Sequence, residues 1–344
     1  MIHVSFYVGI DIANKDFTAS IFSEPNLSVK TMTAIPNEIT GFEQLESWLI
    51  HNKVQANNCV ICLEATGVYG EALSYWLTAK GYNVAVEPPL KVKRAFSDKA
   101  HKNDKADSKK IAEYAYRYLD ELNFWRPKAD IIEQINVLLM TREQLVQQRT
   151  ALKNTLTTLN KKIVQTPLAN DIYKENIGRL TKQINRIEKE LKKHINQHPD
   201  FKQFVSYLVS IPGVGLLLAA NFLVATNGFE KEMAIMHRKL AAYIGICPYE
   251  HSSGSSVYKK PKIPHYGPAR LRKLLHLAAR SVVTHKDQFA LYYQRKLAAG
   301  KERKLVLNNV ANKLLKIMCA VVRNQRPFVD NYVSIHPKLA QINT

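Results

Sequence analysis

Cysteine is scarce in this chain: only four of its 344 residues are cysteines, at positions 59, 62, 247 and 319. Four cysteines are too few for a disulfide scaffold in a chain of this length. Cys59 and Cys62 have the spacing of a zinc half-site, but the stretch that contains them predicts a β-strand, on which residues three apart point to opposite faces. We therefore expect free, buried thiols in a reducing cytoplasm rather than a zinc site.

The chain also lacks a long uninterrupted hydrophobic run. Its longest, over residues 216–225, is interrupted by Asn221 and is much shorter than the roughly 20 residues that cross a membrane. The N-terminus has no basic region ahead of an apolar stretch, so no secretory signal is visible. These absences predict a cytoplasmic protein with no membrane partner.

Acidic residues are the minority among the charged ones. The chain has 29 Asp and Glu against 49 Lys and Arg, which gives a formal net charge of +20. A positive charge this large indicates a polyanionic partner, with nucleic acid first and an acidic membrane surface second. The length leaves room for two or three domains with well-buried cores.

What the first third does contain is an alternation of strands and helices. Three strands are predicted over residues 4–12, 16–22 and 27–35, then a helix over 41–54, a strand over 58–64, a helix around 73–77 and a strand over 82–86. A basic connection over 91–102 leads to a helix that carries Asp104, and Trp125-Arg126-Pro127 closes the domain. This order predicts an α/β domain of the ribonuclease H-like fold, which begins with an antiparallel meander.

Four acidic residues stand where that fold carries its metal ligands. Asp11 lies near the end of the first strand, Glu64 ends the fourth, and Asp104 and Asp107 open the last helix. Asp104 and Asp107 are three apart and so share a helix face, where two carboxylates repel unless a cation lies between them. Oxygen-only ligands suit Mg²⁺ or Mn²⁺, so we expect a metal site acting on a phosphate. Taken alone, such a pair more often only complements the helix dipole.

The middle of the chain has helical heptads. Leucines recur every seven residues at 138, 145, 152 and 159, and after a break at Pro167 a second apolar pattern runs over residues 177–195. Two such helices predict an antiparallel coiled-coil hairpin, or arms that pair between chains. The alternative is two ordinary helices packed on a globular body.

The last third predicts an all-α domain. Residues 208–220 have the pattern of a helix-hairpin-helix element, in which Gly213 and Gly215 let backbone amides meet a DNA phosphate; a plain glycine turn is the alternative. A serine-glycine loop follows over residues 251–256, and then a helix with Arg270, Arg272 and Lys273. A flexible serine loop between basic segments is a candidate for both a hinge and a nucleophile.

Seven short motifs together make the chain resemble the DEDD-type insertion-sequence transposases related to the Piv DNA invertase. The matching stretches are Val8-Gly9-Ile10-Asp11, Leu63-Glu64-Ala65-Thr66-Gly67, Asn103-Asp104-Lys105-Ala106-Asp107, Ile211-Pro212-Gly213-Val214-Gly215, Tyr243 to Pro248, Ser253-Gly254-Ser255-Ser256 and Gly267 to Arg272. The resemblance covers nearly the whole chain, and the motifs occur in the family's order.

The resemblance implies a RuvC-like metal-binding domain at residues 1–127, a coiled-coil linker at 128–198 and a C-terminal transposase domain at 199–335. It also implies a serine that attacks DNA, and a structured non-coding RNA that pairs with donor and target DNA. The family's serine stands directly before a glycine, which corresponds to Ser253. Ser252 beside it leaves the assignment open, and Pro268 stands where the family often has asparagine.

The sequence thus predicts a DNA recombinase with Asp11, Glu64, Asp104, Asp107 and Ser253 as catalytic residues. Its predicted partners are DNA, a guide RNA and further copies of the chain, as a dimer or tetramer formed through the coiled coil. Predicted phosphate contacts are Lys102, Lys105, Gly213, Gly215, Arg270, Arg272 and Lys273. The rivals are a RuvC-like structure-selective nuclease that uses water, and a non-catalytic nucleic-acid-binding protein.

Overall fold

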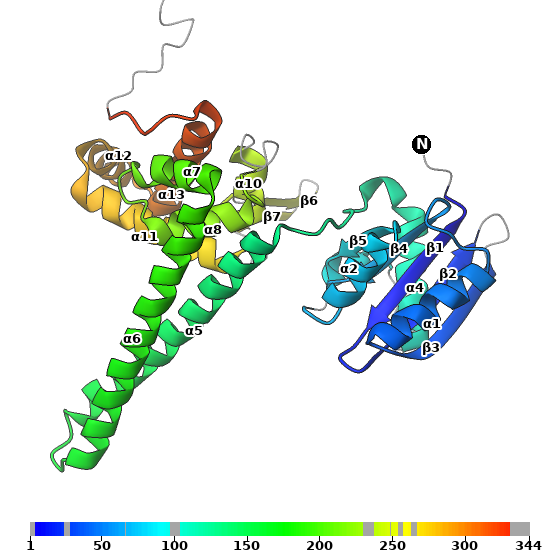
Figure 1. Cartoon of the computed structure of the whole chain (residues 1–344). Coiled ribbons are helices and arrows are strands. Elements are labelled where there is room, and N and C mark those ends of the chain that lie inside the picture. The colour runs from blue at the N-terminus through cyan, green and yellow to red at the C-terminus, as the bar shows by residue number, and fades with distance from the viewer. Residues whose placement is uncertain are drawn as a thin grey trace, which may run out of the picture. The chain divides into compact units, whose positions relative to one another are not determined.

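The chain divides into two compact units, Met1–Pro127 and Lys128–Thr344. The computed structural model describes residues 4–23, 28–65, 67–96, 104–229, 237–247, 249–253, 257–262 and 267–330. The first unit is a sheet with helices, and the second is mostly helical (Figure 1).

The first unit is built on a mixed five-stranded sheet. Its strands are β1 (Phe6–Ile12), β2 (Asp16–Ser23), β3 (Ser28–Pro36), β4 (Cys59–Glu64) and β5 (Asn83–Glu87). The spatial order is β3-β2-β1-β4-β5, with antiparallel pairing among the first three strands and parallel pairing from β1 to β4 and from β4 to β5. This mixed sheet fits the expected ribonuclease H-like domain.

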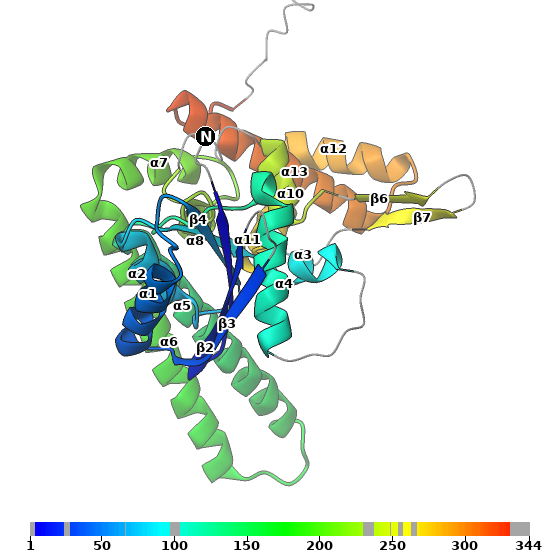
Figure 2. The ribbon, with the colours of Figure 1, turned by 90° about the vertical axis from the view of Figure 1, so that its right-hand side faces the viewer.

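Helices cover both faces of the sheet. The helices α1 (Ile39–His51) and α2 (Glu71–Ala79) lie on one face, and α4 (Asp104–Arg117) lies on the other (Figure 2). Each face has its own apolar core: Cys59 belongs to the core under α1 and α2, and Cys62 to the core under α4. The two thiols are therefore free, buried and on opposite faces, as the strand spacing predicted.

The connection after β5 is more regular than expected. Residues Pro89–Ala95 form the short helix α3, with Pro89 at its first position, where a missing N–H leaves no hydrogen bond unmade. A turn of 3₁₀-helix at Leu119–Glu121 follows α4. Pro88-Pro89 predicts the end of the preceding strand, and the sequence does not otherwise indicate this helix.

A long helical hairpin opens the second unit. Helices α5 (Asp130–Leu159) and α6 (Pro167–Gln197) run side by side in both ribbon views (Figures 1 and 2). The buried side of α6 consists of Leu180, Ile184, Leu191 and Ile195, which repeat at helical spacing. The remaining helices are α7 (Pro199–Val209), α8 (Leu216–Ala225), α10 (His237–Ile244), α11 (Ala269–His285), α12 (Asp287–Ala298) and α13 (Arg303–Asn324).

The second unit is not all-α, so that expectation was wrong. Strands β6 (Tyr249–Ser253) and β7 (Val257–Lys262) form an antiparallel pair over the stretch that was expected to be a loop. Only three residues separate the two strands, a length typical of a hairpin connection. Residues that favour extended backbone flank the serines: Tyr249, Val257 and Tyr258. The serines and glycine between them favour a loop, so the composition of the stretch did not indicate a strand pair.

Within the described residues, α13 is long and apolar enough to cross a membrane. This helix does not form an uninterrupted apolar run in the sequence, because charged and amide residues divide it. However, 56% of its apolar window is buried inside the second unit. Residues such as Val310, Leu314 and Met318 belong to the core of that unit, so α13 has the burial of a core helix.

Candidate functional site

Asp11 and Glu64 lie side by side at the carboxyl ends of the inner strands β1 and β4. The parallel register pairs Ile10 with Leu63, so the next residues of the two strands, Asp11 and Glu64, are neighbours. Ile10 and Leu63 belong to the core under α1 and α2. Because successive strand residues alternate between faces, the two acids belong to the face that α4 covers.

α4 approaches that face unusually closely. A Cβ at Gly9 would lie 2.1 Å from the backbone nitrogen of Ala112 and 2.3 Å from the carbonyl oxygen of Ser108, so only glycine fits. The hydroxyls of Ser20 on β2 and Ser108 on α4 share a buried hydrogen bond of 2.9 Å. These two contacts fix the position along the sheet of Asp107, the residue before Ser108.

The three described carboxylates of the expected site influence one another. Burial raises the pKa of the Glu64 carboxyl above its ordinary value of 4.5, and the negative charges of Asp11 and Asp107 raise it further. Asp107 forms a long ion pair, 3.9 Å, with Lys110 one turn along α4, and both side chains are partly exposed. Glu64 therefore lies in a cluster of negative charge together with Asp11 and Asp107.

Asp104 is the first residue of α4, three residues before Asp107, and its side chain lies outside the described part of the structure. Among the side chains that are described, no three His, Cys, Asp or Glu groups lie close enough together to hold a metal ion. The donor chemistry nevertheless fits a hard divalent cation, because carboxylate oxygens with a raised pKa gain from a neighbouring positive charge.

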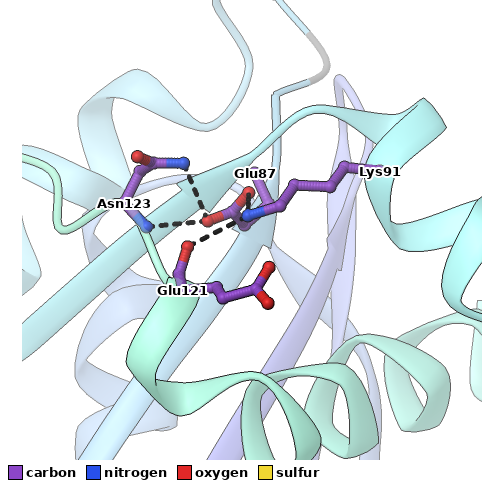
Figure 3. Close-up of polar contacts among 4 residues, drawn as sticks. All are labelled: Glu87, Lys91, Glu121 and Asn123. Carbon is purple, nitrogen blue, oxygen red and sulfur yellow. Dashed lines mark hydrogen bonds and ion pairs between the residues drawn. The ribbon is translucent and has the colours of Figure 1, made fainter.

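Glu87 is a further acid at the carboxyl ends of these strands, and it is not among the residues predicted from the sequence. It pairs with Glu64 in the register of β4 and β5, and it is completely buried. Figure 3 shows how its charge is compensated: Oε1 accepts hydrogen bonds from the backbone N–H of Asn123 at 2.7 Å and from its Nδ2 at 3.2 Å, and Lys91 Nζ lies 3.2 Å from Oε2. Lys91 also donates to the carbonyl of Glu121 at 3.0 Å.

Glu87 therefore has the contacts of a structural acid. It ties α3, through Lys91, and the segment after α4, through Asn123, to the end of β5. The lysine four residues after the glutamate was a visible signal of such a pair. Nothing in the sequence indicated Asn123, which is 36 positions away.

The serines lie on the new hairpin of the second unit. Ser252 pairs with Tyr258 and Ser253 pairs with Val257, which makes Ser253 the last residue of β6. Gly254, Ser255 and Ser256 lie outside the described residues. The candidate nucleophile thus stands at the end of a strand rather than within a free loop.

The predicted glycine contacts differ from each other. Gly213 has a φ of +78°, and a Cβ there would lie 2.7 Å from Val282 Cγ1, so it allows a tight turn against α11. Gly215 is the N-cap of α8, and a Cβ there would meet no atom within 4 Å, so packing does not require a glycine at this position. Lys105 is exposed on α4, and Lys102 lies outside the described residues.

The predicted basic contacts on α11 have partners within the second unit. Arg270 donates from Nη2 to Asn136 Oδ1 at 3.2 Å, and its burial lowers its pKa. Arg272 donates from Nη1 to the carbonyl of Ile244 at 2.9 Å, and Lys273 Nζ lies 2.7 Å from Glu143 Oε1. These contacts attach α11 to α5 and α10, so phosphate binding here would compete with them.

Comparisons with known proteins agree with this layout. A transposase family model of the DEDD, IS110 type matches residues 8–164, and a model described as Transposase IS116/IS110/IS902 family matches residues 193–294. The chain is 29% identical over 330 residues to a pilin gene-inverting protein of Moraxella bovis, covering 94% of this chain and 97% of that protein. It is 28% identical over 265 residues to the transposase for insertion sequence element IS1111A of Coxiella burnetii, covering 67% and 69%.

The first model spans the sheet, α4 and the acidic residues, and the second spans α7, α8, α10, α11 and the serines of the helical unit. The relatives named above include both an insertion-sequence transposase and a gene-inverting protein, and both activities recombine DNA. The chain therefore belongs to the IS110 family of insertion-sequence transposases and is a DNA transposase or recombinase.

Proposed function

We propose that the chain cuts and rejoins DNA with a carboxylate-bound divalent metal ion and a serine nucleophile. The observation that carries this proposal is the register of β1 and β4, which puts Asp11 beside Glu64 beneath α4. The raised pKa of Glu64 supports it, because neighbouring carboxylates repel one another and a cation shared between them removes that repulsion.

Asp11, Glu64, Asp104 and Asp107 would hold Mg²⁺, with Mn²⁺ as an alternative. When bound, the ion supplies positive charge to the scissile phosphate. The Ser253 hydroxyl attacks the phosphorus, a bond forms between its oxygen and phosphorus, and one phosphodiester oxygen leaves as a hydroxyl that takes up the proton. Attack by a second DNA hydroxyl on the phosphoserine then releases the serine and seals the strand. The number of phosphodiester bonds is unchanged.

The partners follow from the same proposal. The substrate is DNA, and the guide is a structured RNA, as the family resemblance implies. The hairpin of α5 and α6 would serve as the coiled-coil linker over residues 128–198 and join copies of the chain into a dimer or tetramer. Residues 199–335 would form the transposase domain with its helix-hairpin-helix element around Gly213, and the protein would act in the cytoplasm.

A covalent adduct between protein and DNA tests the serine directly. The unmodified protein with labelled DNA and Mg²⁺ should give a slowly migrating band on a denaturing gel. Ser253→Ala should lose the adduct and recombination while still binding DNA, and Ser252→Ala is the matched control that keeps both. Loss in Ser252→Ala alone would move the nucleophile by one residue. Cleavage without an adduct in the unmodified protein would replace the serine mechanism by a nuclease that uses water.

A further inference from the structure

The segment from α12 into α13 carries positive charge without counter-charge. Residues 287–316 contain seven lysines and arginines but only two acidic residues. None of the seven forms an ion pair with any carboxylate in the described part of the chain, whereas Lys286 just before them pairs with Asp330 at 3.6 Å. We call the exposed side of α12 and α13 around Tyr292 the α12–α13 surface.

Tyr292 gathers three of these cations around one half-buried ring. Lys313 Nζ lies 4.3 Å from the ring centroid, and the Arg295 guanidinium and Lys296 Nζ each lie 6.0 Å from it. The ring attracts each cation, but the cations repel one another. An anion bound among them would relieve that repulsion.

A cavity of about 390 Å³ lies beside the ring. Phe289, Tyr292 and Ile317 supply aromatic and apolar walls, and Lys313 and Lys316 supply amines to its lining. Its volume falls within the roughly 300–1,000 Å³ typical of ligand pockets. A mostly apolar space bordered by amines has the chemistry that one nucleotide needs, because a nucleotide joins a flat base to a phosphate.

We propose that the α12–α13 surface binds single-stranded nucleic acid, with an unpaired base against Tyr292 and the neighbouring phosphates on Lys313 and Lys316. A duplex keeps its bases stacked inside and offers only phosphates, so it would leave the ring and cavity without a role. This inference rests on the proposed function only in taking nucleic acid as the partner. A recombinase must handle unpaired strands, whether of its DNA or of a guide RNA.

The test measures binding of fluorescein-labelled oligothymidylate of about 15 nucleotides and of an abasic strand of the same length. Removing one stacking ring by Tyr292→Leu should weaken oligothymidylate binding about 5- to 150-fold and leave abasic binding unchanged, while Tyr292→Phe should keep both. The exposed pair Lys313→Gln/Lys316→Gln should weaken both strands and flatten the log–log salt dependence by about 1.4, from two contacts at about 0.7 each. The double variant Lys80→Gln/Lys174→Gln, which removes two positive charges elsewhere, is the control.

Equal weakening of both strands by Tyr292→Leu would show that the ring only positions the cations and would overturn base stacking. Equal weakening by the control pair and by Lys313→Gln/Lys316→Gln would overturn the surface itself. The proposed function fails separately: a protein that binds oligothymidylate through Tyr292 but never joins DNA ends would refute recombination and keep this inference.

Discussion

The carboxyl ends of β4 and β5 carry the same residue type in register, but the two ends differ in what surrounds the charge. Glu64 at the end of β4 has Asp11 and Asp107 near it, and its pKa is raised. Glu87 at the end of β5 is fully buried and has Lys91 and two hydrogen bonds from Asn123. The charge of Glu87 has its partners in the structure and is structural, whereas the charge of Glu64 lies in a negative cluster that a bound cation would neutralise.

The same distinction separates two groups of cations in the second unit. Arg270, Arg272 and Lys273 on α11 were predicted to contact phosphate, and each has a partner in the protein. Lys313 and Lys316 on α13 have no carboxylate partner among the described residues. We therefore expect the second group to contribute more to nucleic-acid binding than the first.

The largest expected effect is on catalysis by Glu64. Glu64→Gln keeps the shape of the side chain and removes a ligand charge, so strand cleavage should fall about a thousandfold, equivalent to several kcal/mol of transition-state stabilisation. Cleavage of labelled DNA at saturating protein and ordinary Mg²⁺ measures it. Retention of full cleavage would remove Glu64 from the site.

The second effect is on stability and concerns Glu87. Glu87→Gln leaves Lys91 without its buried partner, and breaking a buried ion pair from one side costs about 3–5 kcal/mol, although the partial exposure of Lys91 favours the lower end. Urea unfolding monitored by circular dichroism gives the difference. Cleavage per folded molecule should stay close to that of the unmodified protein; a loss as large as that of Glu64→Gln would show that Glu87 belongs to the metal site.

The smallest effect is a dependence of stability on pH. The raised pKa of Glu64 means that its carboxylate is protonated at a higher pH in the folded, metal-free protein than in the unfolded chain. The contribution of Glu64 therefore destabilises the folded state at neutral pH, and the penalty disappears as pH falls through the raised pKa toward 4.5. In EDTA, Glu64→Gln should be more stable than the unmodified protein at pH 7, and the difference should shrink at pH 5. A constant difference would contradict the assigned cause.

The order of the elements in the first unit could be predicted from the sequence because it depends on local patterns, and the role of the four acids stays a prediction. Nearly continuous apolar runs mark β1 and β4, and the acids stand near the ends of those strands and in the first turn of α4. The family resemblance implies that the four acids act as a set. Gly9 was part of a matching motif, but only the structure shows why a glycine is required: any side chain there would clash with the backbone of α4.

The parts that could not be predicted depend on contacts between distant residues. Whether Lys273 is free depends on Glu143, which lies 130 positions away, and the role of Glu87 depends on Asn123. The β6–β7 pair was missed because serine and glycine favour turns, while the strand-forming residues lie at the sides of the serine run. In each case the local pattern was compatible with two outcomes, and long-range packing determined which one occurs.

Binding of Mn²⁺ tests the central claim most directly, because it needs no assumption about DNA or the serine. Isothermal titration calorimetry of the metal-free protein should show specific binding that is lost in Glu64→Gln and kept in Glu87→Gln, when both variants are studied below their unfolding temperatures. Equal binding by all three proteins, or loss only in Glu87→Gln, would contradict the assignment of Glu64 and its acidic neighbours as the metal site.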